Sequence, residues 1–179
     1  IYSKRNWRYH DFRDSNIFNY LPAVEEMTKC GYHAIRLGSH VNKRLDVDNP
    51  QIIDYMSNGS RSDFLDIYLL ANCRFLIISD TGLSGPTEIF RKPIVYVNDF
   101  IFALLNRLSV QDAIFIFKRF YLVKERRFIS FPEILSLNNN GFEYSFNEQI
   151  DKGEIHLIDS TPEEILNATT EMDERLKGT

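Results

Sequence analysis

Cysteine is almost absent from this chain of 179 residues, which contains only Cys30 and Cys73. Two cysteines are too few for a disulfide framework or for a zinc site with several thiolate ligands. Each stands in an apolar stretch of sequence, which is typical of a small buried thiol. We therefore expect both to be buried and reduced, and a reducing compartment favours a cytoplasmic protein.

The chain also lacks a long apolar run and an excess of basic charge. No segment approaches the roughly 18 apolar residues that span a bilayer, and no charged-then-apolar leader opens the chain. A net charge of -4 gives no overall basic field, so nucleic acid is not expected as a partner. Local basic clusters lie at Lys4, Arg5 and Arg8 and at Lys118, Arg119, Lys124, Arg126 and Arg127. Such clusters are most often solvated faces, although the second could also face an anionic membrane or a partner domain.

The first half of the chain alternates between helical and strand patterns. Apolar residues recur at helical spacing from Asp14-Ser15 to Gly31, and a second amphipathic helix is expected at 62–72, with Ser62 as its N-cap. Short apolar runs predict strands at 32–37, 52–56, 74–79 and 93–97. This alternation predicts an α/β fold, a Rossmann-like doubly wound parallel sheet centred on the strands that begin at Tyr32 and Arg74.

The second half is less regular. Residues 99–150 are rich in aromatic side chains and contain a short helical pattern at 131–137, so we expect an insertion or an elaborated connection there. A strand at 155–159 is expected to join the parallel sheet. The last helix is expected to begin with a capping box formed by Thr161 and Glu164, with Pro162 in its first position. This helix should run to about Lys177 and pack outside the sheet.

Residues 78–90, ISDTGLSGPTEIF, pass from the end of an apolar strand into a helix and contain two of the eight glycines of the chain. In a parallel sheet, ligands bind at the carboxyl ends of the strands, where helix N-termini expose backbone N–H groups. Gly82 and Gly85 would let the backbone approach a phosphate or diphosphate, Thr81 and Ser84 would add hydroxyl donors, and Glu88 could accept hydrogen bonds from a diol. The alternative is that the glycines only shape a tight turn.

Two common nucleotide motifs are missing from this stretch. It has no G-x-G-x-x-G spacing and no P-loop lysine, which argues against a conventional dinucleotide oxidoreductase or a nucleoside triphosphatase.

The run SDTGLSGPTEIFRKPIVYVN, together with HDFRDSNIFNYLPAVEEMTKCGYHAIRLG and SRSDFLDIYLLANCRFLI, resembles a family of bacterial glycosyltransferases encoded with surface-polysaccharide genes. The resemblance covers about residues 7–98. The chain is similar more loosely to the donor half of GT-B glycosyltransferases, including heptosyltransferases and nucleotide-sugar 2-epimerases. In those proteins a Ser-Asp-Ser/Thr-Gly turn follows a strand, and a Lys-Pro pair, here Lys92-Pro93, opens the next strand.

The resemblance implies that residues 1–179 are the C-terminal, nucleotide-sugar-binding half of such an enzyme, which would be inactive as an isolated fragment. The acceptor-binding domain is then expected upstream of Ile1. The partners implied are a nucleotide-sugar and that upstream domain, with a membrane surface as a possible further partner of the intact protein.

Several residues are candidates for contacts with the nucleotide-sugar donor. Arg36 could bind a diphosphate through both guanidinium nitrogens or could simply pair with a nearby carboxylate, and Ser62 could bind an anion or only cap its helix. His10 and Asp11 could act as a general base with an orienting carboxylate. The predicted donor-binding residues are Arg13, Arg36, Gly38, Arg61, Ser62, Asp80, Thr81, Gly82, Leu83, Ser84, Gly85, Pro86 and Glu88.

No metal or cofactor is expected. Asp46-Val47-Asp48 has the D-x-D spacing of metal-dependent transferases but falls in a connecting loop, which indicates a solvated turn. GT-B enzymes instead neutralise the leaving diphosphate with helix dipoles and basic side chains. Two alternatives to a transferase stay open, a non-catalytic nucleotide-sugar-binding module and a nucleotide-sugar epimerase of the same architecture.

Overall fold

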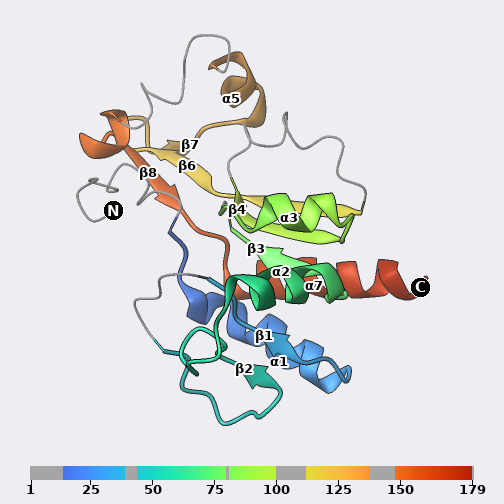
Figure 1. The fold of residues 1–179 in the computed structure, drawn as a ribbon. Helices are drawn as coiled ribbons and strands as arrows, with labels where there is room; N and C mark the ends of the chain where they lie inside the picture. The colour runs from blue at the N-terminus through green and yellow to red at the C-terminus, as the bar shows by residue number, and fades with distance from the viewer. Residues whose placement is uncertain (1–13, 39–43, 80, 100–111, 138–147, 179) are drawn as a thin grey trace.

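The centre of the molecule is a parallel sheet of strands β3 (Leu76–Ile78), β4 (Ile94–Asp99) and β5 (Ala113–Phe117), in the order β3-β4-β5. A computed structural model describes residues 14–38, 44–79, 81–99, 112–137 and 148–178 (Figure 1). All six residues of β4 are buried, because this strand lies between two others and both of its faces are covered. The predicted α/β fold with parallel strands is confirmed.

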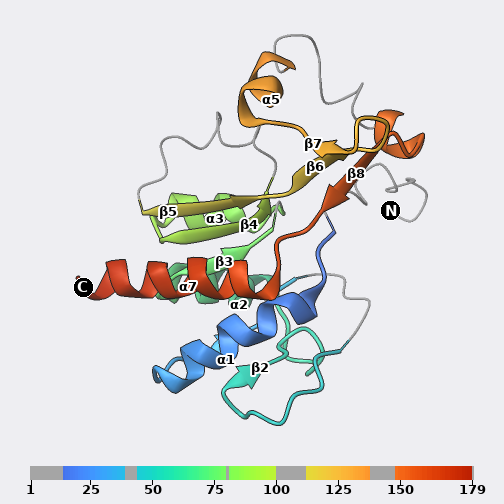
Figure 2. The same ribbon diagram turned by 180° about the vertical axis from the view of Figure 1, so that it is seen from behind.

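Helices cover both faces of this sheet. On one face, Val95 and Val97 of β4 pack with Ala23 of helix α1 (Leu21–Lys29) and with Ile165 and Met172 of helix α7 (Pro162–Lys177). On the other face, a second buried cluster contains Ile78, Ile94 and Tyr96, and Leu83 packs against it at the start of helix α3 (Ser84–Ile89). Figures 1 and 2 show α3 and α7 on opposite sides of the sheet. Successive residues of β4 therefore serve two different cores.

The first predicted helix is present as a 3-10 turn, η2 (Ile17–Tyr20), that leads directly into α1. Asn16 caps η2 by accepting a hydrogen bond from the backbone N–H of Phe18. Gly31 follows α1 with φ +89°, a conformation that favours glycine, and this explains why the helix ends at the expected place.

Strands β1 (Ala34–Ile35) and β2 (Ile52–Ile53) form a separate parallel pair. The prediction of one sheet centred on the strands from Tyr32 and Arg74 is therefore wrong, since β4 is the central strand of the main sheet. The physical reason is size: each strand of the β1–β2 pair has two residues, and Ile35 is exposed, so the pair buries little apolar surface. Helix α2 (Asp63–Asn72) follows and has the predicted bounds to within one residue.

A second sheet is antiparallel and contains β6 (Arg119–Leu122) between β7 (Arg127–Phe128) and β8 (Ile155–Ile158). The prediction that the strand at 155–159 joins the parallel sheet is therefore wrong. Strand β8 pairs with β6 instead, because Phe120 and Ile155 share a small core with Ile134 of helix α5 (Phe131–Leu137). Strand β5, inside the segment 99–150 that was expected to be an insertion, belongs to the main sheet.

Helix α7 begins with the predicted capping box. The Thr161 hydroxyl accepts from the N–H of Glu164, and the Glu164 carboxylate accepts from the N–H of Thr161 at 2.7 Å. Pro162 occupies the first turn, and Gly178 ends the helix with φ +79°. The helix packs against α1 and the main sheet, as expected for a helix outside the sheet.

The prediction for the cysteines is only partly right. Cys30 is exposed, because it lies just beyond the last turn of α1 at the surface, and Cys73 is partly buried with its thiol directed to the carbonyl of Leu70. Within the ranges that the structure describes, no helix has both the length and the apolar character needed to cross a membrane.

Candidate functional site

The glycine turn connects the carboxyl end of β3 to α3. Thr81 and Gly82 are exposed at the surface, whereas Ser84 is buried and its hydroxyl donates to the carbonyl of Thr81 at 3.1 Å. Thr87 similarly donates to the carbonyl of Leu83 at 2.9 Å. Two of the hydroxyls in this segment therefore stabilise the turn and the helix, while that of Thr81 lies at the exposed part of the turn. Asp80 lies outside the described residues.

Backbone conformation accounts for only one of the two glycines of this turn. Gly85 lies in helix α3 directly before Pro86, and a proline ring disfavours helical backbone for a preceding residue that carries a Cβ. Gly82 and Gly85 are not among the glycines with positive φ, in contrast to Gly31 and Gly38, whose φ angles are +89° and +150°. A Cβ built on Gly82 or Gly85 would meet no heavy atom within 4 Å. As far as the described residues show, the fold requires glycine at position 82 neither for conformation nor for packing. The backbone here borders open space.

Glu88 lies one turn into α3 and is tied to the main sheet. Its Oε1 accepts a hydrogen bond of 2.7 Å from the hydroxyl of Tyr96, which is fully buried in β4. The ring of Tyr96 stacks on that of Phe115 with 4.7 Å between the centroids. The predicted diol acceptor is thus held in a fixed orientation, with one of its oxygens already engaged.

Arg36 follows β1 and pairs with a carboxylate, which is one of the two alternatives that the sequence left open. Its Nη1 lies 3.5 Å from Oδ2 of Asp54, and both side chains are mostly buried. The same Asp54 oxygen accepts hydrogen bonds from the N–H of Leu45 and the hydroxyl of Ser57. Gly38, two residues further on, has a φ that favours glycine, so backbone conformation accounts for it.

Arg61 and Ser62 open helix α2 and also have structural partners. Arg61 donates to Oδ2 of Asp66 at 2.8 Å and lies 3.6 Å from the carboxylate of Asp63. Ser62 caps the helix by accepting from the N–H of Leu65, as predicted. Its own N–H donates to the hydroxyl of Tyr55 at 2.9 Å, which joins the start of α2 to the loop that holds Asp54.

The predicted site residues thus form two groups. One group surrounds the loop after β2 and contains Arg36, Gly38, Arg61 and Ser62. The other is the glycine turn with Glu88, and the helices that follow Ser62 and Leu83, α2 and α3, contact each other. His10, Asp11 and Arg13 lie outside the described residues. Asp46 and Asp48 are exposed in a loop, as expected, and the part of the chain that the structure describes holds no group of three potential metal ligands.

A partly buried polar cluster at the carboxyl ends of β4 and β5 was not predicted from the sequence. We call it the polar junction; it consists of Ser15, Tyr20, Asn98, Lys118, Asp159 and Ser160. Asn98 is fully buried with φ +56°; its amide donates to the Ser15 hydroxyl at 2.7 Å, and its Oδ1 accepts from the N–H of Ser160 at 2.6 Å. Ser15 and Tyr20 exchange a further hydroxyl hydrogen bond at 3.0 Å. Burial raises the pKa of Tyr20 to about 12.

Lys118 completes the polar junction. Its side chain is 4% exposed, donates to the carbonyl of Asp14 at 2.8 Å and lies 3.0 Å from Oδ1 of Asp159. One feature of the sequence could have indicated this cluster: Lys118 is a single lysine between two apolar strands, AIFIF and the segment from Arg119. The protein's own polar groups therefore occupy the ends of β4 and β5, while the glycine turn at the end of β3 borders open space.

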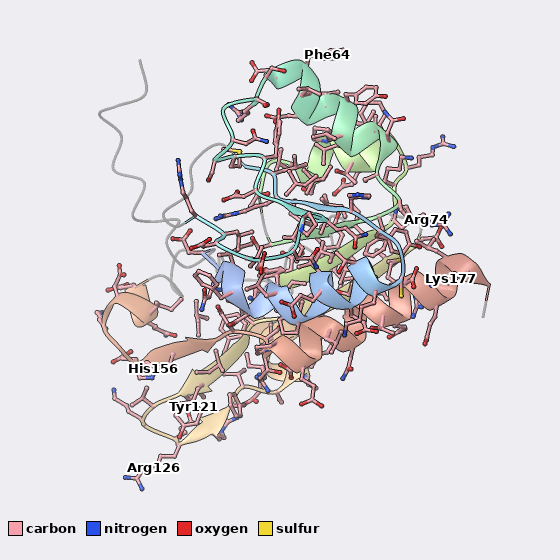
Figure 3. The ribbon with its side chains drawn as sticks, turned by 90° about the horizontal axis from the view of Figure 1, so that it is seen from below. Phe64, Arg74, Tyr121, Arg126, His156 and Lys177 are labelled. Atoms are coloured by element: carbon pink, nitrogen blue, oxygen red, sulfur yellow. The ribbon has the colours of Figure 1, made fainter. Side chains whose placement is uncertain are left out.

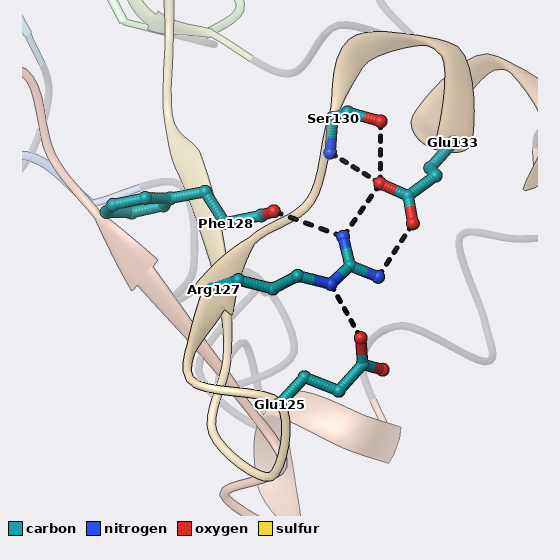
Figure 4. Close-up of polar contacts among 5 residues, drawn as sticks. All are labelled: Glu125, Arg127, Phe128, Ser130 and Glu133. Carbon is teal, nitrogen blue, oxygen red and sulfur yellow. Dashed lines mark hydrogen bonds and ion pairs between the residues drawn. The ribbon is translucent and has the colours of Figure 1, made fainter.

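The second basic cluster of the sequence is largely neutralised by carboxylates. Arg127 makes two hydrogen bonds to Glu133, at 2.7 and 2.9 Å, and one to Glu125 at 2.6 Å (Figure 4). Lys124 pairs with Glu154 at 3.2 Å. The hydrogen bonds from Arg127 hold the pKa of Glu133 down, at about 2. These charges stabilise the antiparallel region instead of forming an open basic surface.

Comparison with other proteins adds no relative: no family model, curated protein or solved structure matches this chain.

Proposed function

We propose that this chain is the donor-binding domain of a GT-B glycosyltransferase, which transfers a sugar from a nucleotide-sugar to a glycan or polysaccharide acceptor. The resemblance of residues 7–98 to bacterial surface-polysaccharide glycosyltransferases suggests this function. The parallel sheet with helices on both faces is compatible with one half of a doubly wound GT-B enzyme.

One observation carries the proposal, namely that the fold does not explain Gly82, which is exposed in the turn. The φ angle of Gly82 is accessible to any residue, and a Cβ at this position would meet no described atom within 4 Å. A ligand whose phosphate oxygens approach the backbone closely would explain why no side chain is present. The turn also lies at the carboxyl end of a parallel strand, where ligands of open α/β sheets bind.

The proposed division of roles follows from the contacts. The exposed Thr81 hydroxyl and backbone N–H groups of the turn would bind the diphosphate, apart from the N–H of Ser84, which donates to the carbonyl of Thr81 at 3.3 Å. Glu88, oriented by Tyr96, would accept a hydrogen bond from the ribose or the sugar. Arg36 and Arg61 are already paired with Asp54 and Asp66, so they would shape the neighbouring loop and contribute less charge to the anion.

The test compares Gly82→Val and Gly85→Val with the parent chain. Binding of nucleoside diphosphates and nucleotide-sugars is measured by calorimetry, with and without divalent metal, and the free energy of unfolding is measured by urea denaturation. We expect Gly82→Val to lose binding at least tenfold, while its free energy of unfolding changes by less than about 1 kcal/mol, because no strain or overlap is introduced. Gly85→Val should lose binding and also some stability, because valine in helical conformation is disfavoured before Pro86. Metal should have no effect.

Gly31→Val is the matched control. Its φ of +89° disfavours a β-branched residue, so this variant should lose stability and, where it is still folded, bind normally. A folded Gly82→Val protein that binds as well as the parent would contradict the proposed site.

A transfer assay separates the enzyme from a non-catalytic module. The chain is assayed together with the acceptor-binding domain that the proposal expects, and release of nucleoside diphosphate is followed with a glycan acceptor. Release that depends on the acceptor and on Gly85 supports the transferase, whereas tight binding without release supports the module. Conversion of the nucleotide-sugar to its epimer, without an acceptor, would support the epimerase alternative.

A further inference from the structure

The antiparallel sheet has one covered face and one open face. Phe120 and Ile155 belong to the core that the sheet shares with helix α5. Tyr121 and His156 follow them directly in β6 and β8, and because side chains alternate along a strand, they point away from that core. Figure 3 shows Tyr121 and His156 next to each other at the edge of the molecule. We call this surface the open face; its residues are Arg119, Tyr121, Phe128, His156 and Ile158.

Three residues form a row across the open face. Tyr121 of the central strand is directly opposite Phe128 of β7 on one side and His156 of β8 on the other, so the three side chains share a face. The rings of Tyr121 and Phe128 meet edge to face, with centroids 5.3 Å apart and 71° between their planes. Phe128 stays 49% exposed although the guanidinium of Arg119 lies over its ring, 5.9 Å from the centroid. The row therefore presents aromatic surface and an exposed imidazole side by side.

The polar atoms of the row are available to a ligand. The Tyr121 hydroxyl and the His156 imidazole make no hydrogen bond with the described residues of the chain. A neutral imidazole offers one donor and one acceptor, and a phenolic hydroxyl can both donate and accept. A ligand that carries many hydroxyl groups satisfies all of these atoms, because each of its hydroxyls also donates and accepts.

The charges around the open face do not favour an anionic ligand. Arg119 lies 3.4 Å from the carboxylate of Glu164, and Lys124, just beyond the end of β6, lies 3.2 Å from that of Glu154. Arg126, in the turn between β6 and β7, is exposed and forms no ion pair with the described residues. Nucleic acid binding depends on several unpaired basic side chains, so a single arginine gives little attraction. A neutral ligand fits this surface better.

The size of the open face distinguishes a small ligand from a protein. The sheet has three strands of two to four residues, and with a spacing of about 4.8 Å and a rise of about 3.4 Å it covers roughly 14 Å by 14 Å, or about 200 Å². A protein partner buries about 800 Å² on each side. The row itself is about 10 Å long, which matches about two linked sugar rings.

We propose that the open face binds a neutral oligosaccharide. The C–H groups of a sugar ring would lie on the ring of Phe128, whose faces carry partial negative charge, and sugar hydroxyls would form hydrogen bonds with Tyr121 and His156. Strand β5 continues directly into β6, so the open face lies beyond the carboxyl end of the main sheet, the end at which the glycine turn also lies (Figure 2). That such a glycan is the acceptor of the transfer rests on the proposed function, whereas the binding surface itself does not.

An NMR titration of the chain with neutral oligosaccharides tests the proposal. The probes are cellotetraose, maltotetraose and N-acetylchitotetraose, each added to about 10 mM, because contacts of this size give dissociation constants on the order of 1 mM. Binding of a probe should shift the signals of Tyr121, Phe128 and His156 and leave those of the glycine turn unchanged.

Substitutions in the row should weaken this binding selectively. Phe128→Ala removes the ring that carries the sugar and His156→Ala removes a hydrogen-bonding group, so each should raise the dissociation constant by about fivefold or more. Both side chains are exposed, and the amide spectrum of each variant verifies that it is folded. Tyr121→Phe keeps the ring and loses only the hydroxyl, so its effect should be smaller. Phe64→Ala, at an aromatic residue that is 75% exposed on α2, is the matched control and should bind like the parent.

Other results would overturn the proposal. No shift with any of the probes would do so, as would equal losses in Phe128→Ala and Phe64→Ala. Shifts of the open face with a single-stranded oligonucleotide alone, weakened by Arg126→Ala, would identify a nucleic-acid surface instead. Gly82→Val should leave oligosaccharide binding unchanged. A chain that binds an oligosaccharide but no nucleotide-sugar would contradict the proposed function and leave the assignment of the open face intact.

Discussion

The parallel and antiparallel regions of this protein are stabilised in different ways. In the parallel region, Ile94, Val95, Tyr96 and Val97 are completely buried in one strand. In the antiparallel region, burial alternates along β8, and many of the polar contacts are ion pairs at the surface. Because buried apolar area contributes more to stability than exposed ion pairs do, the parallel region should carry most of the free energy of folding.

The largest effect is expected from truncation in the core between α7 and the sheet. Ile165 is fully buried, so Ile165→Ala should lower the free energy of unfolding by about 3–4 kcal/mol through lost contacts and a cavity. Phe128→Ala, which removes a half-exposed ring from the antiparallel region, should cost about 1 kcal/mol. Urea denaturation measures both. Equal losses would mean that the two regions contribute alike.

A smaller effect is expected where the two regions meet. Asn98→Ala removes hydrogen bonds to Ser15 and Ser160 and leaves a non-glycine residue at φ +56°, which should cost about 2–3 kcal/mol. Asn98→Gly loses the same hydrogen bonds but accepts the backbone conformation, so it should be about 1 kcal/mol less destabilising. If alanine and glycine are equally destabilising, the conformation of Asn98 stores no strain.

The polar junction should also affect how the free energy of unfolding depends on pH above pH 10. Burial raises the pKa of Tyr20 from 10.0 to about 12, so the folded state keeps this proton while the unfolded state loses it. The stabilising contribution is therefore complete below pH 10 and is lost as the pH rises toward 12, by about 1.4 kcal/mol per pH unit. The free energy of unfolding of Tyr20→Phe should therefore fall less steeply with rising pH than that of the parent, by this amount of about 1.4 kcal/mol per pH unit. Parallel pH profiles for the two proteins would contradict the burial of the hydroxyl.

The smallest effect is expected from the surface network of the antiparallel region. Hydrogen bonds from Arg127 lower the pKa of Glu133 from 4.5 to about 2. The contribution of the Glu133 carboxylate to stability is therefore present above pH 4.5 and disappears as the pH falls toward 2. An NMR titration of the Glu133 carboxyl should give a midpoint near pH 2, and Arg127→Gln should raise it. A midpoint in the ordinary range in the parent protein would show that this network is open in solution.

Helices, strands and caps were predicted well where they depend on residues that are close together in the chain. The apolar run of β4, the Ser62 cap, the capping box at Thr161 and the bounds of α5 all follow from residues close together in the chain. Strand pairing was predicted less well. Strand β8 was placed in the wrong sheet, because its partner is chosen by contacts of Ile155 with Phe120 and Ile134, which are distant in sequence.

In the candidate site too, features set by neighbouring residues were predicted, and features that depend on distant residues were not. That Gly82 and Gly85 stand at the end of a buried strand could be read from the sequence, and so could the cap at Ser62. The carboxylate partners of Arg36 and Arg61 and the whole polar junction could not. Their geometry depends on where loops from different parts of the chain meet, and no spacing rule encodes a buried asparagine in a left-handed conformation.

The ion pair between Lys118 and Asp159 also defines where the antiparallel region is attached. The chain leaves the parallel region at Lys118 and returns at Asp159, and their neighbours Arg119 and Ile158 are paired across the sheet. The segment 119–158 thus starts and finishes at one point, so it has the connectivity of a module that could be cut out and replaced by a short loop. Evolution could have lengthened, exchanged or removed it without disturbing the order of β3, β4 and β5 or the path into α7.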